Sequence, residues 1–156
     1  MKIGIVGNGE DKFTELGEAR AKLEIFKIIV SYPNSKIVSG HSRMGGVDIW
    51  TEEIAKLCGR ESDLDIKAPT EESWDGKYGY KARNTDIAKS DIVFVIVADK
   101  YPENYEERRR FKECYHCHTN SHVKSGACWT GKKAVEFGNQ AQWIIIKNSD
   151  SSCDER

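Results

Sequence analysis

Short apolar runs and amphipathic stretches alternate along the chain, which predicts alternating strands and helices. Buried strands are predicted at residues 2–7, 36–40, 64–68, 91–98 and 141–147. Helical spacing of apolar residues connects them at 14–30, 45–59, the short segment ending at 88, and 126–137. This order favours an α/β fold, a single Rossmann-like, doubly wound parallel sheet of about five strands.

Two segments carry the clearest signals. The run "DIVFVIVA" (91–98) is continuous, β-branched and aromatic, which is typical of a central strand covered on both faces. In 14–30, apolar residues recur at mostly helical spacing, and Thr14 is placed to cap the helix. The residues of that pattern are Leu16, Ala19, Leu23, Phe26 and Ile28.

One domain is expected over residues 1–147, with a Cys/His-rich insertion at 99–125 and a polar tail at 148–156. There is no membrane-length apolar run, and the N-terminus does not resemble a signal peptide. The net charge of −1 argues against nucleic-acid binding over the whole surface. Five cysteines without a secretory signal indicate reduced thiols and a cytoplasmic protein.

Ligands of open parallel sheets bind beyond the carboxyl ends of the strands. Glycines, hydroxyls and one arginine gather where those ends lead into helices, a pattern that suits phosphate. The expected ligand-binding residues are Gly7, Asn8, Gly9, Ser39, Gly40, His41, Gly45, Gly46, Arg83, Asn84, Ser125, Gly126 and Thr130. Neither a complete G-x-G-x-x-G motif nor a Walker-type loop is present, which excludes a dinucleotide dehydrogenase and a Walker-type ATPase.

Aromatic and basic side chains flank these positions. Trp74, Tyr78 and Tyr80 are placed either to stack on a base or to cover the sheet edge. The segment 108–133 is rich in lysine and arginine, which fits either phosphate attraction or an ordinary solvated face.

Three cysteines and a histidine follow the spacing of a zinc knuckle with one extra residue. The set is Cys114, Cys117, His122 and Cys128, with His116 and His118 as substitutes for His122. Thiolate and imidazole ligands suit tetrahedral zinc, and a complete set of four is typical of a structural site. The alternatives are a Cys128 packed in the core, a catalytic thiol at a helix start, and a disulfide.

Three segments carry a resemblance to a known family. "IVSGHSRMGGVDIWTEEIAKLCG", "WDGKYGYKARNTDIAKSDIVFVIV" and "SGACWTGKKAVEFGNQAQWIII" are similar to motifs of the SLOG superfamily. That superfamily includes YspA/YpsA-like proteins, the LOG nucleotide phosphoribohydrolases and the Rossmann-like part of DNA-processing protein A. The resemblance implies a Rossmann-like domain that binds a nucleotide or a nucleotide-derived molecule.

The chain departs from the motifs at two positions. His41 stands in place of a motif glycine, and Lys133 stands where LOG enzymes carry a glutamate that helps to break an N-glycosidic bond. Hydrolysis would therefore need another carboxylate, and the candidates are Asp48, Glu52 and Glu10.

The resulting expectation is a protein that binds a nucleotide-like small molecule and holds a structural zinc ion. N-glycosidic hydrolysis, resembling that of a nucleotide phosphoribohydrolase, is left open. The alternative is a nucleic-acid-binding module related to DNA-processing protein A. No membrane partner is expected, and a homo-oligomer is compatible with the sequence.

Overall fold

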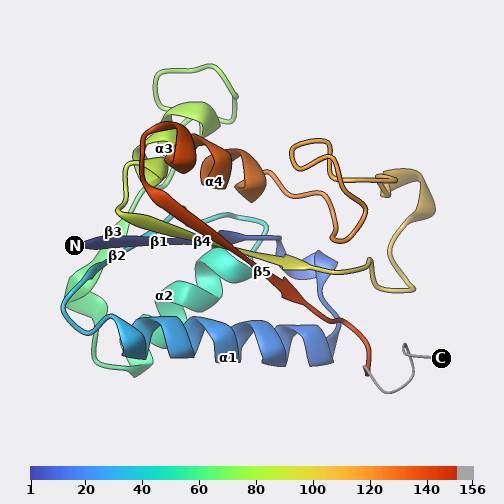
Figure 1. Cartoon of the computed structure of the whole chain (residues 1–156), viewed down its shortest axis with the longest axis horizontal. Coiled ribbons are helices and arrows are strands. Elements are labelled where there is room, and N and C mark those ends of the chain that lie inside the picture. The colour runs from blue at the N-terminus through green and yellow to red at the C-terminus, as the bar shows by residue number, and fades with distance from the viewer. Residues whose placement is uncertain (151–156) are drawn as a thin grey trace.

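The computed structural model describes residues 1–150 and contains one parallel sheet of five strands in the order β3-β2-β1-β4-β5 (Figure 1). The strands are β1 (Lys2–Gly7), β2 (Lys36–Ser39), β3 (Leu64–Ile66), β4 (Ile92–Ala98) and β5 (Gln140–Ile146). The helices are α1 (Glu15–Ser31), α2 (Val47–Leu57), α3 (Tyr80–Ala88) and α4 (Ala127–Glu136). The predicted Rossmann-like α/β fold is confirmed.

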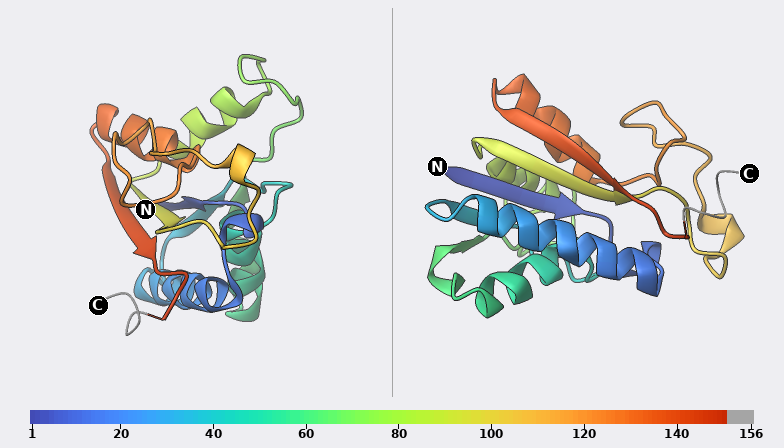
Figure 2. Two further views of the ribbon diagram at one scale, coloured as in Figure 1. Left: turned by 90° about the vertical axis from the view of Figure 1, so that its right-hand side faces the viewer. Right: turned by 60° about the horizontal axis from the view of Figure 1, so that its bottom comes forward.

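The sheet separates two hydrophobic layers. Side chains alternate along β4, so that Ile92, Phe94 and Ile96 pack with α1 and α2, whereas Val93 and Val95 pack with α3 and α4. Figures 1 and 2 show this three-layer arrangement, with α1 and α2 below the sheet and α3 and α4 above it. Every residue of β4 is buried, as its continuous apolar run predicted.

The buried face of α1 differs from the apolar pattern in its sequence. Gly17, Ala21, Ile25, Ile28 and Ile29 face the sheet, and Thr14 caps the helix by accepting a hydrogen bond from the Gly17 N–H. Most of the predicted pattern, namely Leu16, Ala19, Leu23 and Phe26, is exposed. A Cβ on Gly17 would collide with Asn148 Oδ1, so this position needs glycine to admit the buried Asn148 side chain.

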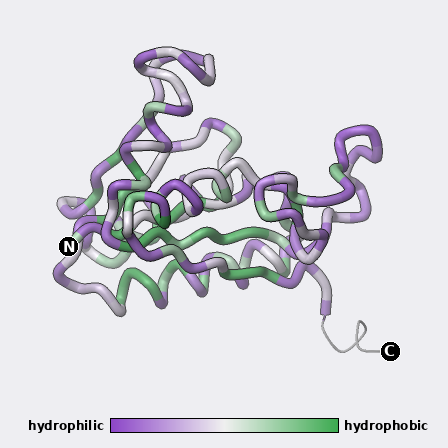
Figure 3. The backbone as a smooth tube through the Cα atoms, turned by 45° about the horizontal axis from the view of Figure 1, so that its top comes forward, coloured by the Kyte–Doolittle hydropathy of each residue, from purple (hydrophilic) through white to green (hydrophobic). Residues whose placement is uncertain are grey.

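The insertion (residues 99–125) leaves the carboxyl end of β4 and returns to the start of α4. It contains a short 3₁₀ helix at Glu107–Arg109 and an isolated antiparallel bridge between Cys114 and Thr119. The Val123 N–H donates to the carbonyl of Ala98, which closes the insertion back onto β4. Figure 3 shows the insertion as mainly hydrophilic chain beside the apolar strands.

Within residues 1–150, none of the helices combines the length and hydrophobicity needed to cross a bilayer.

Asn148 opens the segment predicted as a polar tail, yet it is buried and joins three separate segments. Its amide nitrogen donates to the carbonyls of Lys12 and Lys100, at 2.8 and 2.7 Å. Its side-chain oxygen accepts from the Thr14 N–H. Ordered chain therefore extends past β5, and Cys153 lies outside the described residues.

Replacing Asn148 by alanine leaves several buried backbone groups without partners, so Asn148→Ala is expected to lower the free energy of unfolding by about 3 kcal/mol. Urea denaturation followed by circular dichroism measures this. Asn34→Ala, at an exposed position, is the matched control and is expected to be nearly neutral. Equal stability of the two variants would contradict the structural role of Asn148.

Candidate functional site

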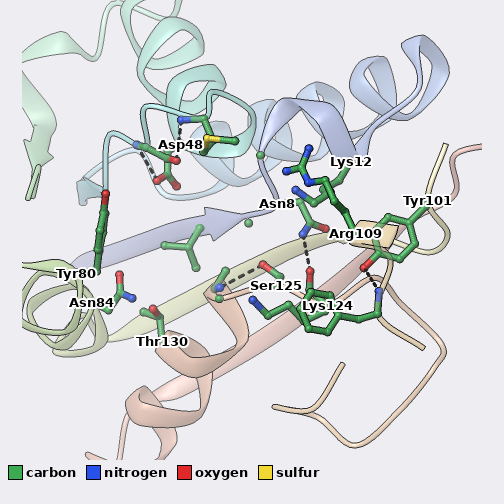
Figure 4. Close-up of a pocket in the computed structure, with 18 of the residues that line it drawn as sticks. Asn8, Lys12, Asp48, Tyr80, Asn84, Tyr101, Arg109, Lys124, Ser125 and Thr130 are labelled. Carbon is green, nitrogen blue, oxygen red and sulfur yellow. Dashed lines mark hydrogen bonds between the residues drawn. The ribbon is translucent and has the colours of Figure 1, made fainter. Parts of the chain in front are cut away.

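A pocket of about 670 Å³ lies beyond the carboxyl ends of β1 and β4, where the strand order reverses direction (Figure 4). This switch point is where open α/β sheets bind ligands. The lining comes from the β1 end (Gly7–Gly9), from the starts of α2, α3 and α4, and from the insertion. The fold therefore brings together segments that are far apart in the sequence.

A buried carboxylate and a guanidinium lie side by side at the α2 end of the pocket. The side chain of Arg83 donates to the carbonyl of Gly40 at 2.5 Å, and a Cβ on Gly40 would lie 2.6 Å from Arg83 Nη1 and 3.0 Å from Asp48 Oδ2. Only glycine at position 40 admits both groups. The backbone N–H of Ser42 donates to Asp48 Oδ2 at 3.1 Å.

Burial raises the pKa of Asp48 from 3.8 to about 6, despite the opposing effects of Arg83 and the Ser42 N–H, which favour the ionised form. The nearby Glu52 raises it further. Asp48 therefore changes its charge near neutral pH.

The start of α4 presents hydrogen-bond donors to the pocket. The Ser125 hydroxyl oxygen accepts from the Ala127 N–H, which leaves its own proton free to donate. Thr130 is 1% exposed and lines the pocket, and its hydroxyl makes no hydrogen bond to any residue of the range 1–150. A Cβ on Gly126 would meet nothing within 4 Å, so the backbone there is open to a ligand.

Asn8 lines the pocket, but both atoms of its amide already have protein partners. Its oxygen accepts from the Ala98 N–H at 3.0 Å, and its nitrogen donates to the Lys124 carbonyl at 3.2 Å. We therefore assign the Asn8 side chain to positioning the pocket walls.

The structure brings eight of the thirteen predicted ligand residues to the pocket wall. These are Gly7, Asn8, Gly9, Arg83, Asn84, Ser125, Gly126 and Thr130. The other five, Ser39, Gly40, His41, Gly45 and Gly46, do not line it. Ser39 donates to the Asp48 carbonyl, and Gly46 packs against the backbone of residues 8–10 with a φ of 78°, where a side chain would collide.

Only one of the three candidate catalytic carboxylates, Asp48, lines the pocket. Glu52 is buried outside it and pairs with His41 Nδ1 at 2.8 Å. Glu10 lies outside the lining, with its Cβ 3.5 Å from the Cβ position of Gly45.

Several lining residues escape prediction from the sequence. Lys12, Tyr101 and Tyr105 reach the pocket from segments that carry no ligand motif, and Lys124 does so beside Ser125. For four lining residues the sequence did carry a signal, the basic character of residues 108–133. These residues are Arg108, Arg109, Arg110 and Lys124. Of the three aromatic candidates, Trp74 and Tyr80 line it and Tyr78 does not.

The predicted metal ligands converge. One ligand atom each from Cys114, Cys117, His122 and Cys128 lies within 4.8 Å of every other. This cysteine–histidine cluster can hold a metal ion, and its three thiols and one imidazole are the donor types that tetrahedral zinc accepts. The cysteines of the cluster, like Cys58, are free rather than paired in disulfides.

Of the three histidines in the insertion, His122 is the one that belongs to the cysteine–histidine cluster. His122 is buried, and its Nδ1 lies 2.8 Å from the carbonyl oxygen of Val123. A proton on Nδ1 satisfies that carbonyl and leaves Nε2 free for a metal, as is usual for metal-binding histidines. His116 and His118 are not in the cluster.

The cluster shares its backbone with the pocket. Cys128 lies in the first turn of α4, and its Sγ accepts from the Trp143 indole N–H at 3.4 Å. Burial raises the pKa of the Cys128 thiol. Burial acts in the same direction at Cys114, but N–H donors led by the Ser125 backbone outweigh it and lower the pKa of that thiol. Ser125 thus faces the pocket with its side chain and the cluster with its backbone.

Comparison with protein-family models and with curated proteins gives no match. Among solved structures, the chain is similar to the molybdenum cofactor carrier protein from Chlamydomonas reinhardtii, with a TM-score of 0.54 and 14% sequence identity. The match covers 97% of this chain and 91% of that one. At this identity the similarity supports the fold.

The raised pKa of Asp48 predicts a pH-dependent cost of folding. The folded-state pKa lies above the unfolded one, so the cost is present above pH 6 and is relieved as pH falls towards 4. Asp48→Asn removes this cost, so the variant should have a higher free energy of unfolding than the wild type. The difference between variant and wild type is expected to be about 2 kcal/mol larger at about pH 7.5 than at about pH 4.5.

Chemical denaturation at both pH values measures the difference, with Asp75→Asn at an exposed position as the control. A gain for Asp48→Asn that does not change with pH would contradict the raised pKa.

Proposed function

We propose that the protein binds a nucleotide or a nucleotide-derived small molecule in the pocket at the β1–β4 switch point. The observation that carries this proposal is the start of α4, where Thr130 lines the pocket with Ser125 and Gly126 and its hydroxyl makes no hydrogen bond within residues 1–150. A helix start with free donors is suited to a phosphate group.

The adjoining wall, beside α3, has the groups that a nucleoside needs. Trp74 lines the pocket and has a ring face on which a base can stack, and Tyr80 lines it with the Arg83 guanidinium 5.5 Å from its ring centroid. The Asn84 oxygen accepts from Arg83 Nε at 2.6 Å, which leaves the Asn84 amide N–H groups for ligand hydroxyls. Arg83 is held beside Gly40 and Asp48, so it enters the pocket preorganised.

Membership of the SLOG superfamily remains part of this proposal. His41 stands where the motif has a glycine, and its φ of 50° lies in the left-handed region that favours glycine. The similar structure is a carrier of the molybdenum cofactor by name, so that cofactor belongs among the ligands to be tested.

Hydrolysis of an N-glycosidic bond would have to use Asp48, because it is the only carboxylate in the pocket lining among the described residues. A pKa of about 6 suits a general acid or base near neutral pH. Lys133, at the position of the LOG glutamate, pairs with Glu136 and does not line the pocket. We therefore propose binding as the function and Asp48 as the residue on which any hydrolysis would depend.

The cysteine–histidine cluster is proposed to hold a structural zinc ion. Its four protein ligands complete a tetrahedron, which leaves no open position for a substrate. The bound ion would hold the insertion against α4 and so maintain the pocket wall.

Removing the Thr130 hydroxyl while keeping its shape tests the ligand site. Thr130→Val is expected to weaken nucleotide binding by about tenfold, the effect of one lost hydrogen bond to a charged group. Isothermal titration calorimetry against a panel of nucleoside phosphates and the molybdenum cofactor measures this. Thr70→Val, at an exposed position outside the pocket, should bind like the wild type. Failure of the wild type to bind any member of the panel would refute the proposed function.

Cys117→Ser tests the zinc site, with Cys58→Ser as the matched control because Cys58 is a free cysteine at the end of α2. Native mass spectrometry should find one zinc ion per chain in the wild type and in Cys58→Ser, and a large loss of zinc in Cys117→Ser. Structural zinc contributes on the order of 10 kcal/mol in small zinc modules, so a chelator should lower the unfolding temperature of the wild type. A metal-free wild type that is unaffected by zinc would exclude this assignment.

A further inference from the structure

The pocket is far more positive than the chain as a whole. Among residues 1–150, six cationic side chains line it and one carboxylate does, although the net charge of the chain is −1. The cations are Lys12, Arg83, Arg108, Arg109, Arg110 and Lys124. All but Arg83 belong to the end of the pocket formed by the insertion and by the turn after β1, which Figure 4 shows on the side opposite Tyr80 and Asn84.

The aromatic rings at this end do not offer free faces for a base. Tyr105 carries the Lys12 ammonium and the Arg109 guanidinium, each 5.3 Å from the ring centroid, and Arg110 lies 5.7 Å from the centroid of Tyr101. The rings fix the positions of the cations through cation–π contacts. A ligand group that enters this end therefore meets positive charge rather than a stacking surface.

Carboxylates pair with four of the five cations at this end. Glu106 lies 3.3 Å from Arg108 and Glu107 lies 3.4 Å from Arg110, and neither glutamate lines the pocket. Asp11 pairs with Lys12 at 2.8 Å and with Arg109 at 3.7 Å, but it does not line the pocket. Lys124 has no carboxylate within 4.0 Å among the described residues and lies over the rings of Phe111 and Tyr115. Because Asp11 is shared between Lys12 and Arg109 and is itself partly exposed, a ligand anion can compete with it for both cations.

We propose that this end is a second anion subsite and that the ligand carries at least two phosphate groups, as a nucleoside diphosphate, triphosphate or nucleotide diphosphate ester does. One phosphate binds at the start of α4, and the next reaches Lys12, Arg109 and Lys124. This inference rests on the proposed function, because it extends the ligand of the same pocket. The insertion thereby selects ligands by the length of their phosphate chain.

The test uses inorganic phosphate, pyrophosphate and tripolyphosphate, which do not depend on the identity of the base. Calorimetric titration without divalent metal, at constant ionic strength, should show affinity rising by about tenfold with each added phosphate. Lys124→Gln and Arg109→Gln should abolish most of that rise, so that these variants bind pyrophosphate and tripolyphosphate little more tightly than they bind monophosphate. Lys112→Gln, an exposed residue of the same insertion that does not line the pocket, is the control and should keep the full rise.

Equal affinities across the three anions, or a loss in Lys112→Gln as large as in Lys124→Gln, would overturn the second subsite. Neither result affects the first phosphate position, which the Thr130→Val comparison with nucleotides tests separately. Circular dichroism of each variant confirms that a lost affinity does not reflect unfolding.

Discussion

One buried amide connects the parts of the protein on which the pocket depends. The side chain of Asn8 bridges the Ala98 N–H at the end of β4 and the Lys124 carbonyl at the end of the insertion. Its backbone carbonyl also accepts the Val47 N–H, which begins α2. Since all these bonds are in a buried or half-buried region, their geometry is fixed, and three loops that would otherwise move independently form one wall.

The pocket combines two electrostatic environments. At the α2 end, burial raises the pKa of Asp48 to about 6 beside the single guanidinium of Arg83. At the insertion end, Lys12 and Arg109 lie over the ring of Tyr105, each 5.3 Å from its centroid. The first environment responds to pH, and the second responds mainly to the charge of what enters, because the charge of arginine does not change in the physiological range.

The sheet was predictable because its strands are short apolar runs with sharp ends, and β4 in particular has no polar residue within Ile92–Ala98. The metal ligands were predictable because their spacing is local, and only the choice of histidine needed the Val123 carbonyl. The orientation of α1 was not predictable from periodicity, because its apolar residues cover two faces, of which Ile25, Ile28 and Ile29 are buried and Leu16, Leu23 and Phe26 are exposed.

The pocket was predictable only where a strand leads directly into a helix. Lys12 ends a short 3₁₀ helix and Tyr101 lies in an irregular segment, and both segments are held by long-range bonds from Asn148 to the carbonyls of Lys12 and Lys100. Asn148 itself stands among polar residues near the chain end, where nothing in the local sequence indicates burial. Such residues are identified by tertiary contacts alone.

Ser125 gives the two halves of the site a thermodynamic connection. Its backbone N–H lowers the pKa of the Cys114 thiol, and its side chain lies at the pocket three residues before Cys128. If an ion in the cluster orders this turn, the free energy that it contributes to ligand affinity must equal the free energy that the ligand contributes to ion affinity. Depletion of the metal would then lower the occupancy of the pocket, and a saturating ligand would slow the loss of the metal by protecting the same turn.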